Sequence, residues 1–437
     1  MNAASASASR FRWTIILLLF AINTVNYVDR SAIAFAAHLI SAEFDLSASE
    51  LGLVLGAFGI GYLITTFPGG YVADRFGARV TFLIAVVLWS LAIGWTGVAT
   101  GFLMLYFARM VLGLAEGPSF PAHSRIVERW LPPHERATAV AIALVAIPVA
   151  LAVGAPLVTY LITAFGWRVM FFILAAAGLA WLPAWYLLGR DFPSQSRFVN
   201  GAERDHIAEG REAQATPAGN SGLSRADWRI ILTTPTLLAG YWSYFVFGYL
   251  LFFVMTWLPD FLRTTYHLDL TQIGWLASLP WAAAAVSLYL VGRWSDRLLV
   301  RTGRTRVARS YLMAGSHALI AIAVLPLLFA DSLPVALACM TVAVAAGLGA
   351  NPVFYAVIAD IVPRAAGTCM GVMNSGLAIS GFLAPALTGF ALDATGSFDA
   401  AFVLIAAFAA SSVIGLLIWH QPDRDLARLK KLAESPT

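Results

Sequence analysis

The chain of 437 residues contains a succession of long apolar stretches, and this feature limits its fold more than any other. A membrane-spanning helix needs roughly 20 mainly apolar residues, and twelve stretches are long enough. Their approximate bounds are 13–38, 50–73, 80–98, 102–128, 137–164, 167–189, 233–262, 271–292, 310–330, 334–361, 367–392 and 400–420. Only 12% of the residues are charged, about half the share of a typical soluble protein. The sequence therefore predicts an all-α polytopic membrane protein with twelve spanning helices.

A polar segment divides these stretches into six and six. Residues 190–232 are rich in charged residues, Gly and Ser and poor in large apolar side chains. We predict an N-terminal six-helix bundle (1–189), a cytoplasmic linker (190–232), a C-terminal six-helix bundle (233–420) and a cytoplasmic tail (421–437). The first apolar stretch is longer than the core of a signal peptide, so we expect it to be retained as a span.

Basic residues are distributed unevenly between the loops. If the N-terminus lies in the cytoplasm, 24 of the 28 Lys and Arg fall on that side, and only Arg168 and Arg263 fall on the outer side. Such asymmetry is the positive-inside pattern of membrane proteins. We therefore expect a multi-pass protein of the cell membrane, the inner one where there are two, with both termini in the cytoplasm.

Four ionisable residues lie well inside predicted spans: Asp29 and Arg30 in the first, and Arg109 and Glu116 in the fourth. Such residues usually face a cavity or a charged partner and mark a transport path. On a helix, Asn23 and Arg30 share one face while Asp29 lies about 100° away. Adjacent residues do not face each other, so we expect Arg30 to reach a central cavity and Asp29 a neighbouring helix. The alternative is that Asp29 simply neutralises Arg30.

The pair in the fourth span is expected to find partners on other helices. Arg109 and Glu116 are about 10 Å apart along the helix axis, too far for a direct contact. Gly113 and Gly117 lie between and beside them, and small residues let another helix approach closely; we expect that helix to be the first span. His123 continues the same face, either as an interfacial residue or as a member of a proton path.

A short motif recurs after equivalent spans of the two halves. Gly-x-x-x-Asp-Arg occurs at 70–75 and again at 292–297. Parallel repetition of two six-span halves is typical of one transporter architecture. We expect these loop charges, with Arg79, to form a conformational latch between the halves, and Gly70 and Gly77 to supply close helix approach and a tight turn. The latch residues are Gly70, Asp74, Arg75, Arg79, Asp296 and Arg297.

The extended motif Gly-x-x-x-Asp-Arg-x-Gly-x-Arg at 70–79 resembles the loop motif of the major facilitator superfamily. Four further stretches resemble one branch, the anion:cation symporter family, which includes sugar-acid permeases and the sialin and vesicular glutamate transporters. They are NYVDR (26–30), GYLITTFPGGYVADRFG (61–77), ARMVLGLAEGPSFPAHSRIVERWLPPHERA (108–137) and TWLP (256–259). The resemblance covers the whole chain and implies two pseudo-symmetric six-helix bundles. Thr66 departs from it, because relatives often have Gln there, and this leaves the substrate open.

These features together nominate a binding site. A guanidinium is a planar fork that binds carboxylates bidentately, which favours Arg30 and adds Arg109. The resemblance implies that Tyr62 and Asn374, and less strongly Asn351, contact hydroxyl or carboxylate groups. No nucleotide-binding loop, metal-ligand spacing or catalytic triad occurs in the sequence, so we expect neither enzyme activity nor a cofactor or metal.

Charge balance inside the membrane suggests a mechanism. Two arginines and two acids sum to zero, and a monocarboxylate adds one negative charge that protonation of Asp29 or Glu116 removes. Anion and proton then favour each other's binding. We predict proton-coupled uptake of a small organic anion, such as a sugar acid or another carboxylate or sulfonate, by alternating access, with Asp29 and Glu116 carrying protons.

Other readings of the sequence stay open. They are an organic anion exchanger, a proton-driven exporter and, outside transport, a membrane sensor. The expected partners are the anion, protons and the lipid bilayer, without nucleic acid, and a monomer is the expected state.

Overall fold

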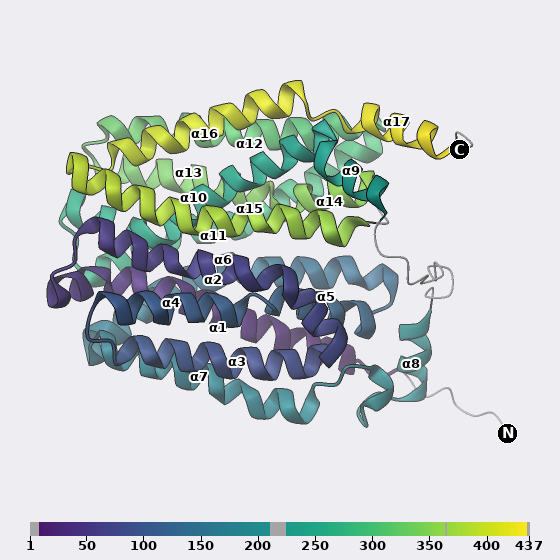
Figure 1. The fold of residues 1–437 in the computed structure, drawn as a ribbon, viewed down its shortest axis with the longest axis horizontal. Coiled ribbons are helices and arrows are strands. Elements are labelled where there is room, and N and C mark those ends of the chain that lie inside the picture. Colours follow the sequence, from purple (N-terminus) through teal and green to yellow (C-terminus); the bar gives the residue numbers. More distant parts are fainter. Residues whose placement is uncertain (1–7, 210–223, 363–364, 435–437) are drawn as a thin grey trace.

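A computed structural model gives the structure of the protein and describes residues 8–209, 224–362 and 365–434. The N-terminal residues 1–7, part of the predicted linker (210–223) and the end of the predicted tail (435–437) lie outside the described residues. Figure 1 shows two layers of long helices, the N-terminal half in purple to blue beside the C-terminal half in green to yellow. Across the described ranges the ordered elements are all helical, which confirms the predicted fold class.

The N-terminal half consists of seven helices. They are α1 (Phe11–Phe44), α2 (Ala48–Phe76), α3 (Ala78–Gly97), α4 (Phe102–Glu116), α5 (Ser119–Trp130), α6 (Pro133–Phe165) and α7 (Trp167–Leu188). The linker contributes η1 (Pro193–Gln195), α8 (Gly201–Ala208) and α9 (Arg225–Thr233).

The C-terminal half repeats the arrangement. Its elements are α10 (Pro235–Tyr266), α11 (Leu270–Thr302), η3 (Arg306–Ser310), α12 (Tyr311–Val324), η4 (Leu325–Phe329), α13 (Leu333–Gly349), α14 (Asn351–Ile361), α15 (Ala366–Thr395) and α16 (Asp399–Ile418). The last helix, α17 (Pro422–Glu434), follows the bundle. The start of α1, the linker helices α8 and α9, and α17 lie at one end of the molecule (Figure 1). We call this the linker end, and the opposite one the far end.

Eleven helical segments in the described ranges are long and apolar enough to cross a membrane. The remaining predicted span, the fourth (102–128), is divided into α4 and α5 at Gly117 and Pro118. Pro118 lacks a backbone N–H and crowds the carbonyl one turn earlier, which interrupts the helix. The tenth predicted span breaks at the equivalent place, between α13 and α14, next to Pro352. Glu116 and Asn351 therefore both lie at helix breaks near the middle of a span.

The two halves pack tightly at the far end, where α2 crosses α15. A Cβ atom on Gly52 would lie 2.6 Å from the carbonyl oxygen of Pro385, so only glycine allows this approach. Asp393 of α15 accepts hydrogen bonds from the backbone N–H groups of Ala48 (3.0 Å) and Ser49 (2.8 Å) at the start of α2. The far end is therefore closed between these two helices.

Candidate substrate-binding and proton-coupling site

A cavity of about 100 Å³ lies between the halves, and residues from both line it. Five of the predicted site residues are among them: Arg30, Tyr62, Glu116, Asn351 and Asn374. The apolar lining from α6 comes from residues 140–147, in the part of that helix nearer the linker end. Because α2 and α15 close the far end, the cavity extends from the middle of the bundle toward the linker end.

Arg30 occupies the centre of this site. Its Nε donates to Oε2 of Glu116 at 2.5 Å, so its ion-pair partner is Glu116 and not the adjacent Asp29. Its guanidinium carbon lies 4.7 Å from the ring centre of Tyr27, 4.8 Å from Phe58 and 5.0 Å from Tyr62. Cation–π contacts of this kind stabilise a charge in apolar surroundings. The guanidinium is thus oriented by one carboxylate and three rings while it faces the cavity.

Asp29 and Arg109 lie behind Arg30 and are not among the residues that line the cavity. Asp29 is fully buried, and neither of its carboxyl oxygens has a hydrogen-bond partner among the described residues. Nη2 of Arg109 donates to the carbonyl of Arg30 at 3.4 Å, while its Nε and Nη1 lack a partner in the same ranges. The two side chains are close enough to interact electrostatically. Arg109 was predicted to contact substrate, but in this conformation it does not line the cavity and contacts the backbone of Arg30 instead.

The glycines of the fourth span pack on α2, which corrects the expectation that they pack on the first span. A Cβ on Gly113 would lie 2.7 Å from the backbone nitrogen of Tyr62, and one on Gly117 would lie 2.9 Å from that of Thr66. The reason is that α2 carries its own glycine here: a Cβ on Gly61 would lie 2.8 Å from the nitrogen of Leu114. Two small-residue surfaces meet and the backbones approach closely.

The C-terminal half supplies an uncharged wall to the cavity. The hydroxyls of Tyr244 and Tyr355 lie 2.9 Å apart, and Nδ2 of Asn374 donates to the carbonyl of Met370 at 2.8 Å. Oδ1 of Asn351 is buried without a hydrogen-bond partner in the described chain. Sequence reasoning missed Tyr355, although its position four residues after Asn351 places it on the same helix face.

Three of the predicted latch residues, Asp74, Arg79 and Asp296, contact their own halves in this conformation. Asp74 pairs with Arg125, and Asp296 pairs with Arg309 at 3.0 Å. Nη2 of Arg79 donates to the carbonyl of Tyr186 at 2.8 Å. Among the described residues, no ion pair through these side chains joins one half to the other. This is the arrangement expected if the predicted latch is open in this conformation.

The two glycines of this motif differ. Gly77 forms the expected tight turn with φ of +85°. A Cβ on Gly70 would meet no atom within 4 Å. The predicted close approach at Gly70 is therefore wrong for this conformation.

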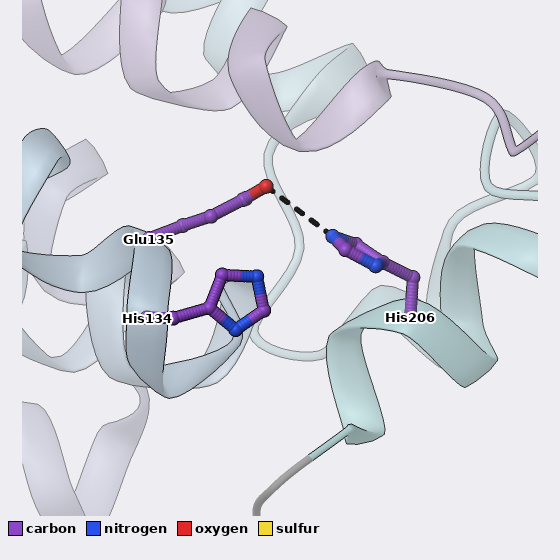
Figure 2. Close-up of side chains that lie close together, drawn as sticks. All are labelled: His134, Glu135 and His206. Carbon is purple, nitrogen blue, oxygen red and sulfur yellow. Dashed lines mark hydrogen bonds and ion pairs between the residues drawn. The ribbon is translucent and has the colours of Figure 1, made fainter.

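A separate cluster lies at the linker end, outside the cavity. His134, Glu135 and His206 place their ligand atoms within 4.8 Å of one another, and Figure 2 shows Glu135 and His206 facing each other between α6 and α8. Glu135 is already engaged by Arg12, whose Nε lies 2.8 Å from Oε2, and by Nε2 of His206 at 3.2 Å. Arg12 also pairs with the buried Glu203 of α8 at 3.1 Å. The cluster is therefore explained as a contact that holds α8 against the N-terminal half.

Comparisons with known proteins agree with this structure. The family model of the Major Facilitator Superfamily matches residues 19–325 and 243–436. The chain is 32% identical to the hexuronate transporter of Bacillus subtilis (strain 168), over 93% of this chain and 94% of that protein. It is 31% identical to the probable sulfoacetate transporter of Cupriavidus necator, over 93% and 94%, and 28% identical to the D-galactonate transporter of Escherichia coli O6:H1, over 95% and 96%.

Solved structures show the same fold. An inward-facing, unoccupied bacterial homolog of the human lysosomal transporter Spinster superposes with a TM-score of 0.74 at 20% identity, covering 96% of this chain and 98% of that one. The D-xylose–proton symporter gives 0.72 at 17% identity, covering 93% and 97%. The sequence relatives confirm the resemblance to the anion:cation symporter branch. The chain is a multi-pass membrane protein that belongs to the Major Facilitator Superfamily of transporters, and it is not an enzyme.

Proposed function

We propose that the protein takes up a small organic anion, such as a sugar acid or another carboxylate or sulfonate, by proton-coupled symport with the linker end in the cytoplasm. The observation that carries this proposal is the position of Arg30, which faces the cavity and is paired with Glu116 at 2.5 Å. The names of three relatives, which refer to hexuronate, sulfoacetate and D-galactonate, support an anionic substrate.

Anion recognition follows from the chemistry of the guanidinium. The contact with Glu116 uses Nε, and the fork of a guanidinium offers further N–H groups that match a carboxylate or sulfonate. The hydroxyl and amide groups of Tyr62, Asn351 and Asn374 line the same cavity. Such groups orient the neutral part of a ligand by hydrogen bonds.

Proton coupling follows from competition for Arg30. An incoming anion and the Glu116 carboxylate both require the same guanidinium, and protonation of Glu116 releases Arg30 for the anion. Proton and anion therefore promote each other's binding, which is reciprocal linkage. Asp29 is the second proton carrier that we propose, because it is buried and its two carboxyl oxygens have no hydrogen-bond partner in the described ranges. Neutralisation also lowers the cost of moving charge against the membrane potential, about 2.3 kcal/mol per charge per 100 mV.

Alternating access follows from the two ends of the molecule. The far end is closed by α2 and α15, while the cavity extends toward the linker end. Rocking of the halves about the central site would separate α2 from α15 and bring the two Asp-Arg loops together. Asp74 and Asp296 would then exchange their partners within each half for partners across the interface.

The proposal is tested with purified protein in proteoliposomes. Uptake of labelled glucuronate, galactonate and sulfoacetate is measured with an imposed inward proton gradient, with and without a protonophore, and with protein-free vesicles as the control. Accumulation of at least one acid above equilibrium, abolished by the protonophore, supports the proposal. Accumulation that survives the protonophore contradicts proton coupling, and no uptake of any organic anion contradicts the substrate class.

A further inference from the structure

A second polar pair, Asn23 and His123, lies in the cavity on the linker side of Arg30 and Glu116. Asn23 precedes Arg30 by seven residues in α1, and His123 follows Glu116 by seven residues. In the continuous helix α1, seven residues correspond to two helical turns, about 10 Å along the axis. The site therefore has two poles: a charged pole of Arg30 and Glu116, and an uncharged pole of Asn23 and His123.

The free group at the uncharged pole is a hydrogen-bond donor. Nδ2 of Asn23 lies 3.4 Å from Nδ1 of His123. An amide nitrogen only donates, so Nδ1 accepts, and a neutral imidazole then carries its proton on Nε2. His123 is 5% exposed, and its Nε2 has no hydrogen-bond partner among the described residues. A buried donor without an acceptor is unfavourable, and an acceptor on a ligand in the cavity would satisfy it.

The surroundings of this pole indicate what kind of acceptor fits. Among the residues that line the cavity in the described chain, Arg30 is the only Lys or Arg. Apart from Glu116, the residues of the fourth span and of α6 that line the cavity are uncharged or neutral, and they include Ser119, Ser124, Val140 and Ala143. Nothing there compensates a second anionic charge, so the acceptor is a neutral oxygen.

We propose that His123, oriented by Asn23, binds a hydroxyl oxygen at the end of the substrate remote from the acid group that Arg30 binds. The site then selects extended polyhydroxy monoacids over short acids and over diacids. An acid with a chain of several carbons and a hydrogen bond at each end reaches across two helical turns, whereas a two-carbon acid does not. This inference rests on the proposed function, because it requires that Arg30 binds an acid.

The test compares long and short acids in wild-type protein and in four variants. Labelled galactonate uptake is measured in proteoliposomes together with inhibition by unlabelled galactonate, glycolate and the diacid galactarate. Wild type should bind galactonate at least tenfold more tightly than glycolate or galactarate. His123→Ala should raise KM for galactonate at least tenfold, change kcat less than twofold and leave the glycolate inhibition constant unchanged. His123→Gln, which keeps a donor, should restore most of the affinity.

Asn23→Ala provides a second route to the same question if His123→Ala does not fold, because it removes the group that fixes the imidazole. It should raise the inhibition constant of galactonate, as His123→Ala does, and leave the inhibition constant of glycolate unchanged. A variant that weakens both acids equally, or neither, overturns the inference, as does a wild type that prefers glycolate or galactarate. If wild type binds none of these acids but takes up another organic anion, the inference alone fails; if it takes up no organic anion, or if Arg30→Lys leaves all inhibition constants unchanged, the proposed function fails as well.

Discussion

Arg30 is held between Glu116 and three aromatic rings, and this surrounding fixes the direction of its fork. A lysine at this position keeps the charge but loses the planar, bidentate geometry. We expect Arg30→Lys to raise the KM for the transported anion at least tenfold, equivalent to about 1.4 kcal/mol. Arg263→Lys, at the far end of α10 with a 37% exposed side chain, is the matched control and should transport normally. An unchanged KM in Arg30→Lys would show that the anion is bound elsewhere.

At the scale of elements, the contact between α2 and α15 closes one face of the transporter. A Cβ on Gly52 would collide with the carbonyl of Pro385, so Gly52→Ala should destabilise the closed far end and slow uptake several-fold. A cysteine pair at Ala48 and Asp393 reports the closure, and its oxidative cross-linking should decrease when Gly52→Ala is added. Gly315→Ala, where a Cβ meets no atom within 4 Å, is the control. Equal cross-linking in both backgrounds would argue against this role of α2.

The attachment of α17 to the C-terminal half should depend on pH. Asp425 accepts from Oγ1 of Thr236 at 2.6 Å and pairs with Arg424 at 2.9 Å. Burial acts to raise the pKa of Asp425, but the hydrogen bonds from Arg424 and Thr236 outweigh it and hold the pKa below its usual value. A lowered folded-state pKa gives stability that is present above the unfolded pKa, about 3.9, and is lost as pH falls through the folded-state value.

A spin label at Arg428→Cys measures this attachment directly. The label should become more mobile as the pH falls below the unfolded pKa of about 3.9 and through the lower folded-state pKa of Asp425, where the carboxylate takes up a proton. With Asp425→Asn added, the label should be mobile at pH 7 and largely insensitive to pH. A label whose mobility does not change with pH in either background would contradict the assigned role of Asp425.

For the whole molecule, the pattern of apolar and polar residues predicted the helices and the direction of side chains on them, but not which side chains contact each other. The number and order of the apolar stretches predicted two helical halves, and the helical stripe placed Arg30 toward the cavity and Asp29 away from it. The partner of Arg30 could not be predicted, because it depends on which helix lies opposite. For the same reason Gly113 was expected on α1 and packs on α2. The position of Arg109 outside the cavity lining, and the lack of a described hydrogen-bond partner for Nε2 of His123, likewise depend on packing between helices distant in sequence.

The state of the molecule is also a property of the whole chain. The sequence motif predicted a latch of loop charges between the halves. In this structure Asp74 and Asp296 form ion pairs within their own halves, while α2 and α15 hold the far end closed. A sequence contains the residues of both states, and a single structure shows one of them. We therefore expect the same side chains to change partners as the halves rock.

The most direct test of the central claim, that anion and proton meet through Arg30 and Glu116, is to separate accumulation from exchange in Glu116→Gln. Glutamine keeps the shape but cannot take up or release a proton, so proton-driven accumulation and its pH dependence should be lost. Counterflow of labelled for unlabelled anion needs no net proton movement and should persist, with Asp331→Asn, an exposed loop acid, behaving as wild type in both assays. If Glu116→Gln still accumulates the anion with unchanged pH dependence, Glu116 does not couple the proton and the mechanism is wrong.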